Sequence, residues 1–276
     1  METNSTEINC QFCKGNKFKI IKRLEKGYYY KCKKCGSIIQ TPYPDKIVLD
    51  ELYYNYKNIK TKNSDYLNIE RFDIFKNEFE KSMKEIKFPG FNINDKCVDF
   101  GCANGMLLKY MSDKCYVIGI DKSKTLLSEA AKLAPTATLL NSESLTDILS
   151  LSFKIDKYFF MDVLEHTLSP ELIIAQSKMS LKPDGYIIIS TPVSGFISSI
   201  FGSKWRFLLE NEHLNIPSIK GINSILELYN YKIEGITRFG SGFTYGMCNS
   251  VIKKIFDFLA KFFKIGDRAV LLVKNK

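Results

Sequence analysis

The stretch Asp99–Gly105, with the sequence Asp-Phe-Gly-Cys-Ala-Asn-Gly, constrains the fold more than any other part of the chain. It follows an apolar run over 96–98 that is typical of a β-strand, and it precedes an apolar run over 106–111 that is typical of a helix. Glycine at such a turn lets the backbone approach a nucleotide-like ligand, and the amide groups that begin the helix can bond the ligand's polar atoms. The turn therefore predicts a ligand site where a strand ends.

The next strand-like run, 116–120, ends at an acidic residue, Asp121. A carboxylate at this position of a strand–helix–strand unit can accept hydrogen bonds from both hydroxyls of a ribose. A glycine turn alone is a weak signal, but the turn, the strand–helix–strand pattern and Asp121 together are much stronger. They predict a nucleotide-like cofactor at this site.

Strand-like and helix-like segments alternate through most of the remaining chain. After Asp121 the pattern predicts helix 123–133, strand 137–140, strand 157–163, helix 170–181, strand 185–191, helix 219–229 and strand 232–239. The apolar run 266–273 is expected to be a last strand, antiparallel and inserted in the sheet. We therefore predict an α/β fold with a doubly wound, Rossmann-like, seven-stranded sheet, whose ligands lie at the carboxyl ends of the strands.

Four of the eight cysteines form two Cys-x-x-Cys pairs, which are separated by 18 residues: Cys10, Cys13, Cys32 and Cys35. This spacing matches a four-cysteine zinc ribbon, in which four thiolates surround one structural ion. A disulfide pair is the less favoured alternative, and a redox pair is less favoured still, because neither pair begins a helix. The other cysteines, at positions 97, 102, 115 and 248, stand in apolar surroundings and are expected in the core.

The formal charge of +10 is concentrated near the amino end, where residues 1–36 hold nine basic and three acidic side chains. Basic residues of the ribbon are candidates for phosphate contacts, although a solvated face is the favoured interpretation: Lys14, Lys17, Lys19, Lys22, Lys33 and Lys34. Only five of the 40 basic residues are arginine, the side chain that nucleic-acid readers use for bidentate contacts. A hydrophobic content of 45% excludes a disordered chain.

Residues 46–88 are expected to be helical and to precede the sheet, a place from which helices often cover a ligand cleft. Four tyrosines of this segment are possible cleft residues, although packing is the favoured role for most: Tyr53, Tyr54, Tyr56 and Tyr66. The segment 1–7 is polar and slightly acidic, unlike a secretory signal. The uncharged stretch 185–203 is broken by Pro192 and Gly195, so it is not expected to span a membrane. We expect a cytoplasmic protein.

Several motifs, in order over about 96–240, resemble the class I S-adenosylmethionine-dependent methyltransferases, especially the subgroup related to the ubiquinone-biosynthesis O-methyltransferases. The matching stretches are Asp99–Gly105, Gly119–Ser123, Asp162–His166 with Pro170 after it, Leu181–Pro192, and His213-Leu before a helix. Together with the cysteine spacing and the helical segment, the resemblance predicts three units: a zinc ribbon over 1–44, a helical linker or lid over 45–92, and a methyltransferase domain over 93–276.

The resemblance also implies the cofactor site. Asp99 and Gly101 of the turn would approach the methionine moiety of S-adenosylmethionine, with Gly105 allowing close packing, and Cys102 is a further candidate for cofactor binding. Asp121 would hold the ribose, and the adenine would be contacted by Lys122, Asn141 and Ser142. Two residues depart from the family pattern: Asn141 stands where Asp is usual, and Ala103 replaces the middle glycine. The methyl group of Ala103 is expected to be tolerated only with a negative φ.

A hydroxyl acceptor needs a base, and the chain has only two histidines. His166 is the leading candidate, although it could equally cap or pack the next helix, and Asp162 and His213 are the further candidate catalytic residues. Asp162, Glu165 and His166 could also bind a divalent metal, as in the ubiquinone-pathway relatives. Trp205 lies in a long loop predicted over 193–217, where it could stack on a sugar or a base, or belong to the core.

Relatives with this layout often resemble enzymes of glycan or secondary metabolism. We therefore predict O-methylation of a small molecule, a sugar or sugar-nucleotide, with an RNA methyltransferase as the alternative and a cofactor-binding scaffold without catalysis as a third possibility. The segment 250–264 is amphipathic. Packing on the sheet or on a second subunit, which would make a homodimer, is favoured over contact with a membrane surface.

Overall fold

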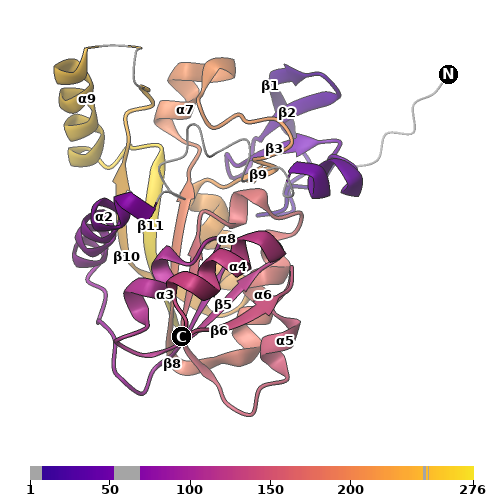
Figure 1. The fold of residues 1–276 in the computed structure, drawn as a ribbon. Helices are drawn as coiled ribbons and strands as arrows, with labels where there is room; N and C mark the ends of the chain where they lie inside the picture. Colours follow the sequence, from indigo (N-terminus) through magenta and orange to yellow (C-terminus); the bar gives the residue numbers. More distant parts are fainter. Residues whose placement is uncertain (1–7, 53–68, 245–246, 248) are drawn as a thin grey trace.

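The computed structural model describes residues 8–52, 69–244, 247 and 249–276. Its largest element is a seven-stranded sheet with the order β10-β11-β8-β7-β4-β5-β6 (Figure 1). The strands are β4 (Lys96–Phe100), β5 (Tyr116–Asp121), β6 (Thr138–Asn141), β7 (Ile155–Met161), β8 (Leu181–Pro192), β10 (Tyr231–Phe239) and β11 (Arg268–Asn275). Strands β4 to β8 run parallel, whereas β11 is antiparallel to both β8 and β10. The predicted sheet and the inserted last strand are confirmed.

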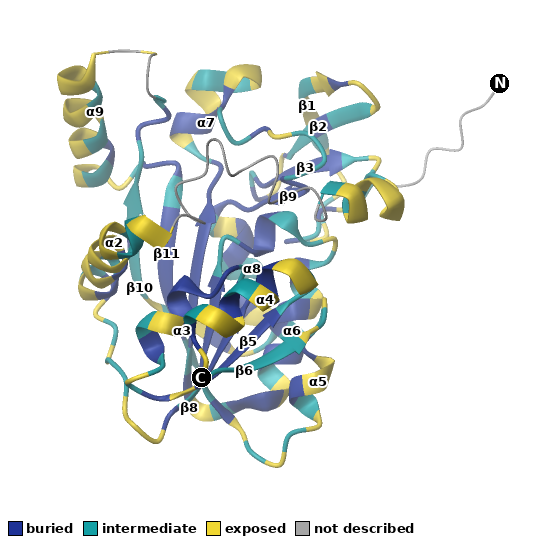
Figure 2. Cartoon of the chain, in the orientation of Figure 1, coloured by how far each residue is buried: buried dark blue, intermediate teal, exposed yellow. Residues whose placement is uncertain are grey.

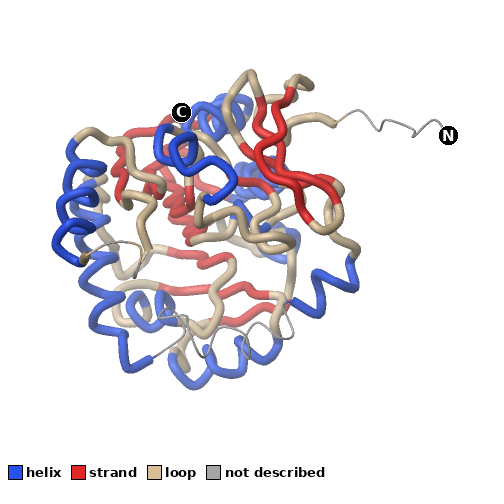
Figure 3. The backbone as a smooth tube through the Cα atoms, turned by 90° about the horizontal axis from the view of Figure 1, so that it is seen from above, coloured by secondary structure: helices blue, strands red, loops and turns tan. Residues whose placement is uncertain are grey.

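Helices cover both faces of this sheet, as a doubly wound fold requires (Figure 3). Three helices contribute core residues on one face: α2 (Phe72–Glu85), α3 (Met106–Met111) and α4 (Lys124–Leu133). Three others do so on the opposite face: α5 (Thr146–Leu149), α6 (Pro170–Ser180) and α8 (Ile219–Leu228). The α/β fold class is therefore confirmed.

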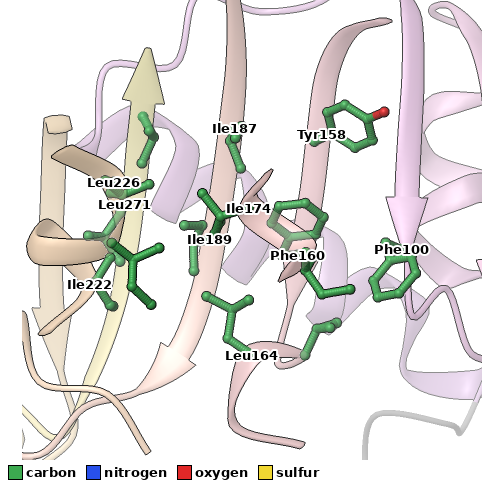
Figure 4. Close-up of a cluster of buried hydrophobic side chains, with 14 of the residues drawn as sticks. Phe100, Tyr158, Phe160, Leu164, Ile174, Ile187, Ile189, Ile222, Leu226 and Leu271 are labelled. Carbon is green, nitrogen blue, oxygen red and sulfur yellow. The ribbon is translucent and has the colours of Figure 1, made fainter. Parts of the chain in front are cut away.

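Alternate residues of the central strands supply the two halves of the core. In β7, Tyr158 and Phe160 belong to the cluster with α6 and α8, whereas Phe159 points into the cluster with α2 and α3. All three side chains are fully buried, and Figure 4 shows Phe160 beside Ile189 and Phe100 of the neighbouring strands. Because both faces are buried, the middle of these strands is apolar in sequence, as in 158–160 of β7 and 187–189 of β8. This packing fixes the carboxyl ends of β4, β5, β7 and β8, where the candidate site lies.

A second sheet is built on the N-terminal ribbon, the name used below for residues 8–41. Its strands β1 (Phe18–Leu24), β2 (Gly27–Cys32) and β3 (Ile38–Thr41) are joined by β9 (Asn215–Ile216), which pairs antiparallel with β3. The segment 193–217 was expected to be a loop, and that prediction is wrong, since it also holds α7 (Phe196–Phe201) and η4 (Gly202–Lys204). These elements are too short to show a periodic pattern in sequence.

The predicted helical segment over 46–88 is confirmed in two parts. Residues 46–52 are helical, and η2 (Ile69–Arg71) leads into α2. The four tyrosines named as cleft candidates (Tyr53, Tyr54, Tyr56 and Tyr66) lie outside the described residues. Cys97, Cys102 and Cys115 are buried, as expected.

The amphipathic segment near the carboxyl end forms α9 (Ser250–Phe262), which connects β10 to β11. Only Ala260 of this helix is buried, so the expectation that its bulky apolar side packs on the sheet is wrong (Figure 2). Within the described ranges, no helix combines the length and the apolar character that crossing a bilayer requires.

Candidate active site

The turn after β4 adopts a backbone that suits glycine at two of its positions. Gly101 has φ +78° and Gly105 has φ +86°. A Cβ atom on Gly105 would lie 2.9 Å from Cα of Ala130, so this glycine lets the turn that opens α3 approach α4. A Cβ atom on Gly101 would lie 2.7 Å from Cγ2 of Val163, which places the turn against the segment that follows β7.

Ala103 has φ +48°, so the expectation that it keeps a negative φ is wrong. In this conformation its amide donates a hydrogen bond to Oδ2 of Asp121 at 2.9 Å. The other carboxylate oxygen, Oδ1, accepts the amide of Ser123 at 2.8 Å. Asp121 thus connects the turn after β4 to the turn after β5 by two hydrogen bonds. The bond from the amide of Ala103 is made with the backbone of that residue in the left-handed conformation.

Replacing Ala103 by glycine is expected to stabilise the fold slightly. The left-handed conformation costs a residue with a Cβ atom about 1 kcal/mol, and the greater freedom of glycine in the unfolded chain offsets about half of that. Chemical denaturation should show a higher free energy of unfolding for Ala103→Gly. The matched control is Ala131→Gly at an exposed position inside α4, where glycine should destabilise by about 1 kcal/mol. Equal destabilisation by both substitutions would contradict the strain at Ala103.

Asp99, at the start of the turn, is a buried carboxyl group that the fold leaves unsatisfied. Its side chain is 2% exposed, and Oδ1 finds no hydrogen-bond partner among the residues that the structure describes. Burial, together with the nearby charge of Asp121, raises the pKa of Asp99 to about 8. A buried polar atom is costly unless it is bonded. Asp99 therefore fits a donor group of a bound ligand.

A cavity of about 660 Å³ opens at the ends of β5 and β6. Its lining includes Lys122, Asn141 and Ser142, three of the residues predicted to contact the cofactor, together with Lys46 and Asp50 from the helical residues 46–52. The amide nitrogen of Asn141 donates to the carbonyl oxygens of Asp121 (3.0 Å) and Lys122 (2.9 Å), so Oδ1 is the end of this side chain that can accept from a ligand.

Cys102 differs from its neighbours in the turn, because its side chain belongs to the core. Burial raises the pKa of its thiol. What Cys102 can offer a cofactor is therefore its backbone.

A second group of polar residues gathers beside the turn, at the ends of β7 and β8. Glu165 and His166 belong to η3 (Leu164–His166), and His213 precedes β9. The two imidazole rings are 4.8 Å apart, edge to face. Nδ1 of His166 lies 2.8 Å from the carbonyl oxygen of Glu212, and Nδ1 of His213 lies 2.8 Å from that of Phe207. Since a carbonyl oxygen can only accept, Nδ1 carries the proton and Nε2 is the basic nitrogen of each neutral ring.

Glu165 is the buried member of this group. Its Oε2 accepts the hydroxyl of Thr191 at 2.9 Å, and its Oε1 lies 4.0 Å from Nε2 of His166. Burial and the charge of Asp162 raise the pKa of Glu165 to about 8. One side-chain atom each of Glu165, His166 and His213 lies within 4.8 Å of the others, so the three could hold a metal ion.

Asp162, predicted from sequence to join Glu165 and His166, is not among the three residues whose side-chain atoms converge. Both of its carboxylate oxygens accept from Nη2 of Arg268 at 2.5 Å, and Oδ1 accepts the hydroxyl of Ser190 at 3.1 Å. Sequence reasoning missed Arg268, because it lies in no motif. Its place follows only from the insertion of β11 beside β8, which sets Arg268 opposite Pro192.

Trp205, predicted either to stack on a ligand or to belong to the core, belongs to the core. Its side chain is 2% exposed, and Nε1 donates to Oδ2 of Asp267 at 3.1 Å. It packs with Tyr29, Ile38 and other buried residues between the N-terminal ribbon and the segment before β9. Trp205 therefore helps to join the two sheets.

The N-terminal ribbon also holds the backbone of His213. The hydroxyl of Tyr29 bonds the carbonyl oxygens of Leu209 (2.6 Å) and His213 (2.9 Å). The side chain of Gln40 makes two bonds to Asn211: its Nε2 donates to Oδ1 of Asn211 at 2.9 Å, and its Oε1 accepts the backbone amide of Asn211 at 2.8 Å. The position of His213 therefore depends on residues about 180 positions earlier in the chain.

The four cysteines of the ribbon converge on one point. Sγ of Cys10 lies 3.6 Å from that of Cys35, Sγ of Cys13 lies 3.6 Å from that of Cys32, and all four sulfur atoms lie within 4.8 Å of one another. These separations are far longer than a disulfide bond, so the four cysteines are free thiols and the disulfide alternative is wrong. The cluster could hold a metal ion.

Comparison with known proteins agrees with this arrangement. A family model described as a methyltransferase domain matches residues 70–235, more than half of the chain. The ubiquinone biosynthesis O-methyltransferase of Bartonella quintana (strain Toulouse) is 34% identical over 103 residues. That match covers 36% of this chain and spans only 41% of the length of the relative.

Solved structures with low sequence identity share the fold. A SAM-dependent methyltransferase from Archaeoglobus fulgidus superposes with a TM-score of 0.54 at 14% identity, over 84% of this chain and 100% of that chain. A plantazolicin methyltransferase, solved in complex with a triazolic desmethylPZN analog and SAH, gives a TM-score of 0.51 at 16% identity, over 84% and 91% of the two chains. With the family match and the motifs around Asp99 and Asp121, these findings show that the chain belongs to the methyltransferase-domain family and has the fold of S-adenosylmethionine-dependent methyltransferases.

Proposed function

We propose that this protein transfers a methyl group from S-adenosylmethionine to a hydroxyl group of a small molecule, a sugar or sugar-nucleotide. The observation that carries the proposal is the position of two histidines and a buried glutamate beside the glycine turn. The contact between Gly101 and Val163 links the turn to the segment that holds Glu165 and His166. A candidate base thus lies next to the candidate cofactor site.

The residues around the turn fit the cofactor. Asp99 has a buried oxygen without a hydrogen-bond partner among the described residues, which suits the donor groups of a methionine moiety. Each carboxylate oxygen of Asp121 accepts one backbone amide and has capacity for a second bond, which suits the ribose hydroxyls. Lys122, Asn141 and Ser142 line the adjoining cavity, where the adenine would lie.

Methyl transfer to a hydroxyl group requires one proton acceptor. When bound, S-adenosylmethionine supplies an electrophilic methyl group on a sulfonium ion. His166 would accept, at Nε2, the proton of the acceptor hydroxyl as the methyl group passes from the sulfonium sulfur to that oxygen, which breaks the carbon–sulfur bond and leaves a neutral thioether. Glu165, 4.0 Å from Nε2, and His213, in edge-to-face contact with the ring, would position the imidazole. The bond from Nδ1 of His166 to the carbonyl of Glu212 fixes the tautomer that this role requires. General bases contribute about 10²- to 10⁴-fold to such reactions.

The same group of residues offers a second way to activate a hydroxyl. Two imidazoles and a carboxylate suit a divalent transition metal, which could orient a diol. The donors would be Glu165, His166 and His213, because the carboxylate of Asp162, the third donor expected from sequence, is bound by Arg268.

In the N-terminal ribbon, we propose a structural zinc ion bound by Cys10, Cys13, Cys32 and Cys35. A zinc–sulfur distance of about 2.3 Å in a tetrahedral site implies sulfur atoms about 3.8 Å apart. Two of the pairs are 3.6 Å apart, close to that value. Four thiolates leave no open position for water, so this ion would hold the fold and take no part in the reaction.

The RNA alternative receives less support from the ribbon's lysines, since several bond inside the chain. Lys14 pairs with Glu171, Lys22 donates to the carbonyl oxygen of Leu208 at 2.9 Å, and Lys34 donates to that of Cys13 at 3.1 Å. Side chains engaged in this way are less available for phosphates.

Transfer of a labelled methyl group to pools of nucleotide sugars and of total RNA distinguishes these functions. We expect label in the sugar fraction. We also expect His166→Ala to lower kcat about 100-fold or more, with little change in the affinity for S-adenosylhomocysteine (SAH), the demethylated cofactor. Leu168→Ala, at an exposed position two residues further along, is the matched control and should retain activity. Label in RNA alone would contradict the sugar acceptor, and full activity of His166→Ala would remove that residue as the base.

A further inference from the structure

Helix α9 is attached to the protein by its polar side. Asp257 accepts the amide of Ser241 at 2.9 Å and pairs with Lys253 at 2.5 Å. One turn further on, Lys261 pairs with Glu85 at the end of α2. These side chains and Ala260 form the inward stripe of the helix, and all of them are buried or half-buried.

The opposite side of α9 is apolar and exposed to solvent. We call it the outer face, and it consists of Val251, Ile252, Ile255, Phe256, Phe258, Leu259, Phe262 and Phe263. Phe258 is 65% exposed, Phe262 is 68% exposed and Phe263 is 62% exposed. A surface helix of a globular protein ordinarily buries its apolar side and shows its charges to water. In α9 this arrangement is reversed, as the yellow outer surface of the helix in Figure 2 shows.

The outer face continues toward α7 through a series of aromatic contacts. The ring centroid of Phe256 lies 5.1 Å from that of Phe243, which in turn lies 5.3 Å from that of Phe201. On α7, Phe196 is 58% exposed and Ile200 is 63% exposed. Helix α7 follows the carboxyl end of β8, and α9 connects β10 to β11. Both helices therefore lie at the end of the sheet where the parallel strands finish, which is also where the candidate active site lies (Figure 1).

The charged residues of α9 indicate which kind of partner the outer face can bind. Residues 250–264 hold four lysines and one aspartate, a net charge of +3. Lys254 on α9 and Lys264 just after its end are exposed, and Asp257, the one carboxylate in the sequence of α9, is half-buried and paired with Lys253. Contact between two copies would bring like charges together, whereas anionic lipid headgroups attract them. A helix with an apolar face flanked by lysines is the kind that lies in the plane of a bilayer surface.

We propose that the outer face of α9, with the exposed apolar residues of α7, binds anionic lipid bilayers. The helix would lie along the membrane with its phenylalanines below the headgroups and Lys254 and Lys264 among them. This binding does not depend on which acceptor is methylated, and it would place the active-site edge of the sheet near the membrane.

Co-sedimentation of the full chain with vesicles tests this proposal. We expect binding to vesicles of phosphatidylglycerol and phosphatidylcholine in equal parts, weaker binding to phosphatidylcholine alone, and release at high salt. The double substitution Phe258→Ser with Phe262→Ser should weaken binding about tenfold or more, because both side chains leave the apolar layer. The matched control is Ile93→Ser, which removes a 73% exposed apolar side chain away from α9 and should bind as the unaltered protein does.

Three results would overturn the proposal. The first is an unaltered protein that does not sediment with the anionic vesicles, and the second is binding that the double substitution leaves unchanged. The third is a dimer, detected by analytical ultracentrifugation, that the double substitution dissociates, since the outer face would then be a contact between copies. Thermal unfolding of the double variant should match that of the unaltered protein, because both phenylalanines are exposed.

Discussion

Replacing Cys32 by serine is expected to abolish methyl transfer, although Cys32 lies in the N-terminal ribbon and outside the candidate active site. If the ribbon binds zinc, loss of one thiolate removes most of the binding free energy that folds it, which is about 10–16 kcal/mol in zinc-finger peptides. Without the folded ribbon, the bond from Tyr29 to the carbonyl of His213 and the pairing of β3 with β9 are lost. His213 would then leave its place beside His166.

Metal analysis, activity and SAH titration together check this prediction. Zinc content should fall with activity in Cys32→Ser, and SAH affinity should change much less, because Asp99 and Asp121 are held by β4 and β5. Limited proteolysis of Cys32→Ser should reveal a new cleavage site between residues 205 and 216. Lys33→Ser, at the neighbouring exposed position, is the matched control and should keep both metal and activity. A metal-free Cys32→Ser protein with full activity would contradict the role given to the ribbon.

Replacing Asp121 by asparagine is expected to weaken SAH binding about 100-fold. Both carboxylate oxygens of Asp121 accept backbone amides, from Ala103 and Ser123. The side-chain NH₂ of asparagine would face one of these N–H groups, so one turn must move. The ribose hydroxyls would also lose a charged acceptor, and each such bond contributes about 1.5–3 kcal/mol.

Isothermal titration with SAH measures this loss directly. Glu143→Gln is the matched control, because Glu143 lines the same cavity at an exposed position. We expect its SAH affinity to stay within about threefold of the unaltered protein, in keeping with the small contribution of an exposed charge. Unchanged SAH affinity in Asp121→Asn would remove Asp121 from the cofactor site.

Local patterns were enough to predict the sheet and the glycine turn, because each depends on residues close in sequence. The run 158–161, Tyr-Phe-Phe-Met, is apolar at every position, which is the pattern of a strand buried on both faces. The positive φ of Ala103 was missed for the opposite reason. It accompanies a bond to Asp121, 18 residues away, and no feature of the turn itself indicates that bond.

The group around His166 was only partly predictable for the same physical reason. The sequence places Asp162, Glu165 and His166 together because they share one segment. Whether a carboxylate is available there depends on Arg268, which reaches Asp162 only after β11 has entered the sheet. The orientation of α9 likewise depends on Glu85 and Ser241, which come from distant segments. Amphipathic spacing shows that a helix has two sides, but not which side the rest of the protein binds.

The pairing of β3 with β9 also limits how the chain can be divided. Ile38 pairs with Ile216 in a sheet whose two parts are 178 positions apart in the sequence. A shortened protein starting at residue 45 would leave the edge of β9 unpaired and expose Trp205 and Ile216, both now buried. Such a fragment would tend to aggregate, and the ribbon could not be exchanged for that of a relative without its matching segment before α8. A stable exchange of the ribbon would therefore have to replace both segments at once.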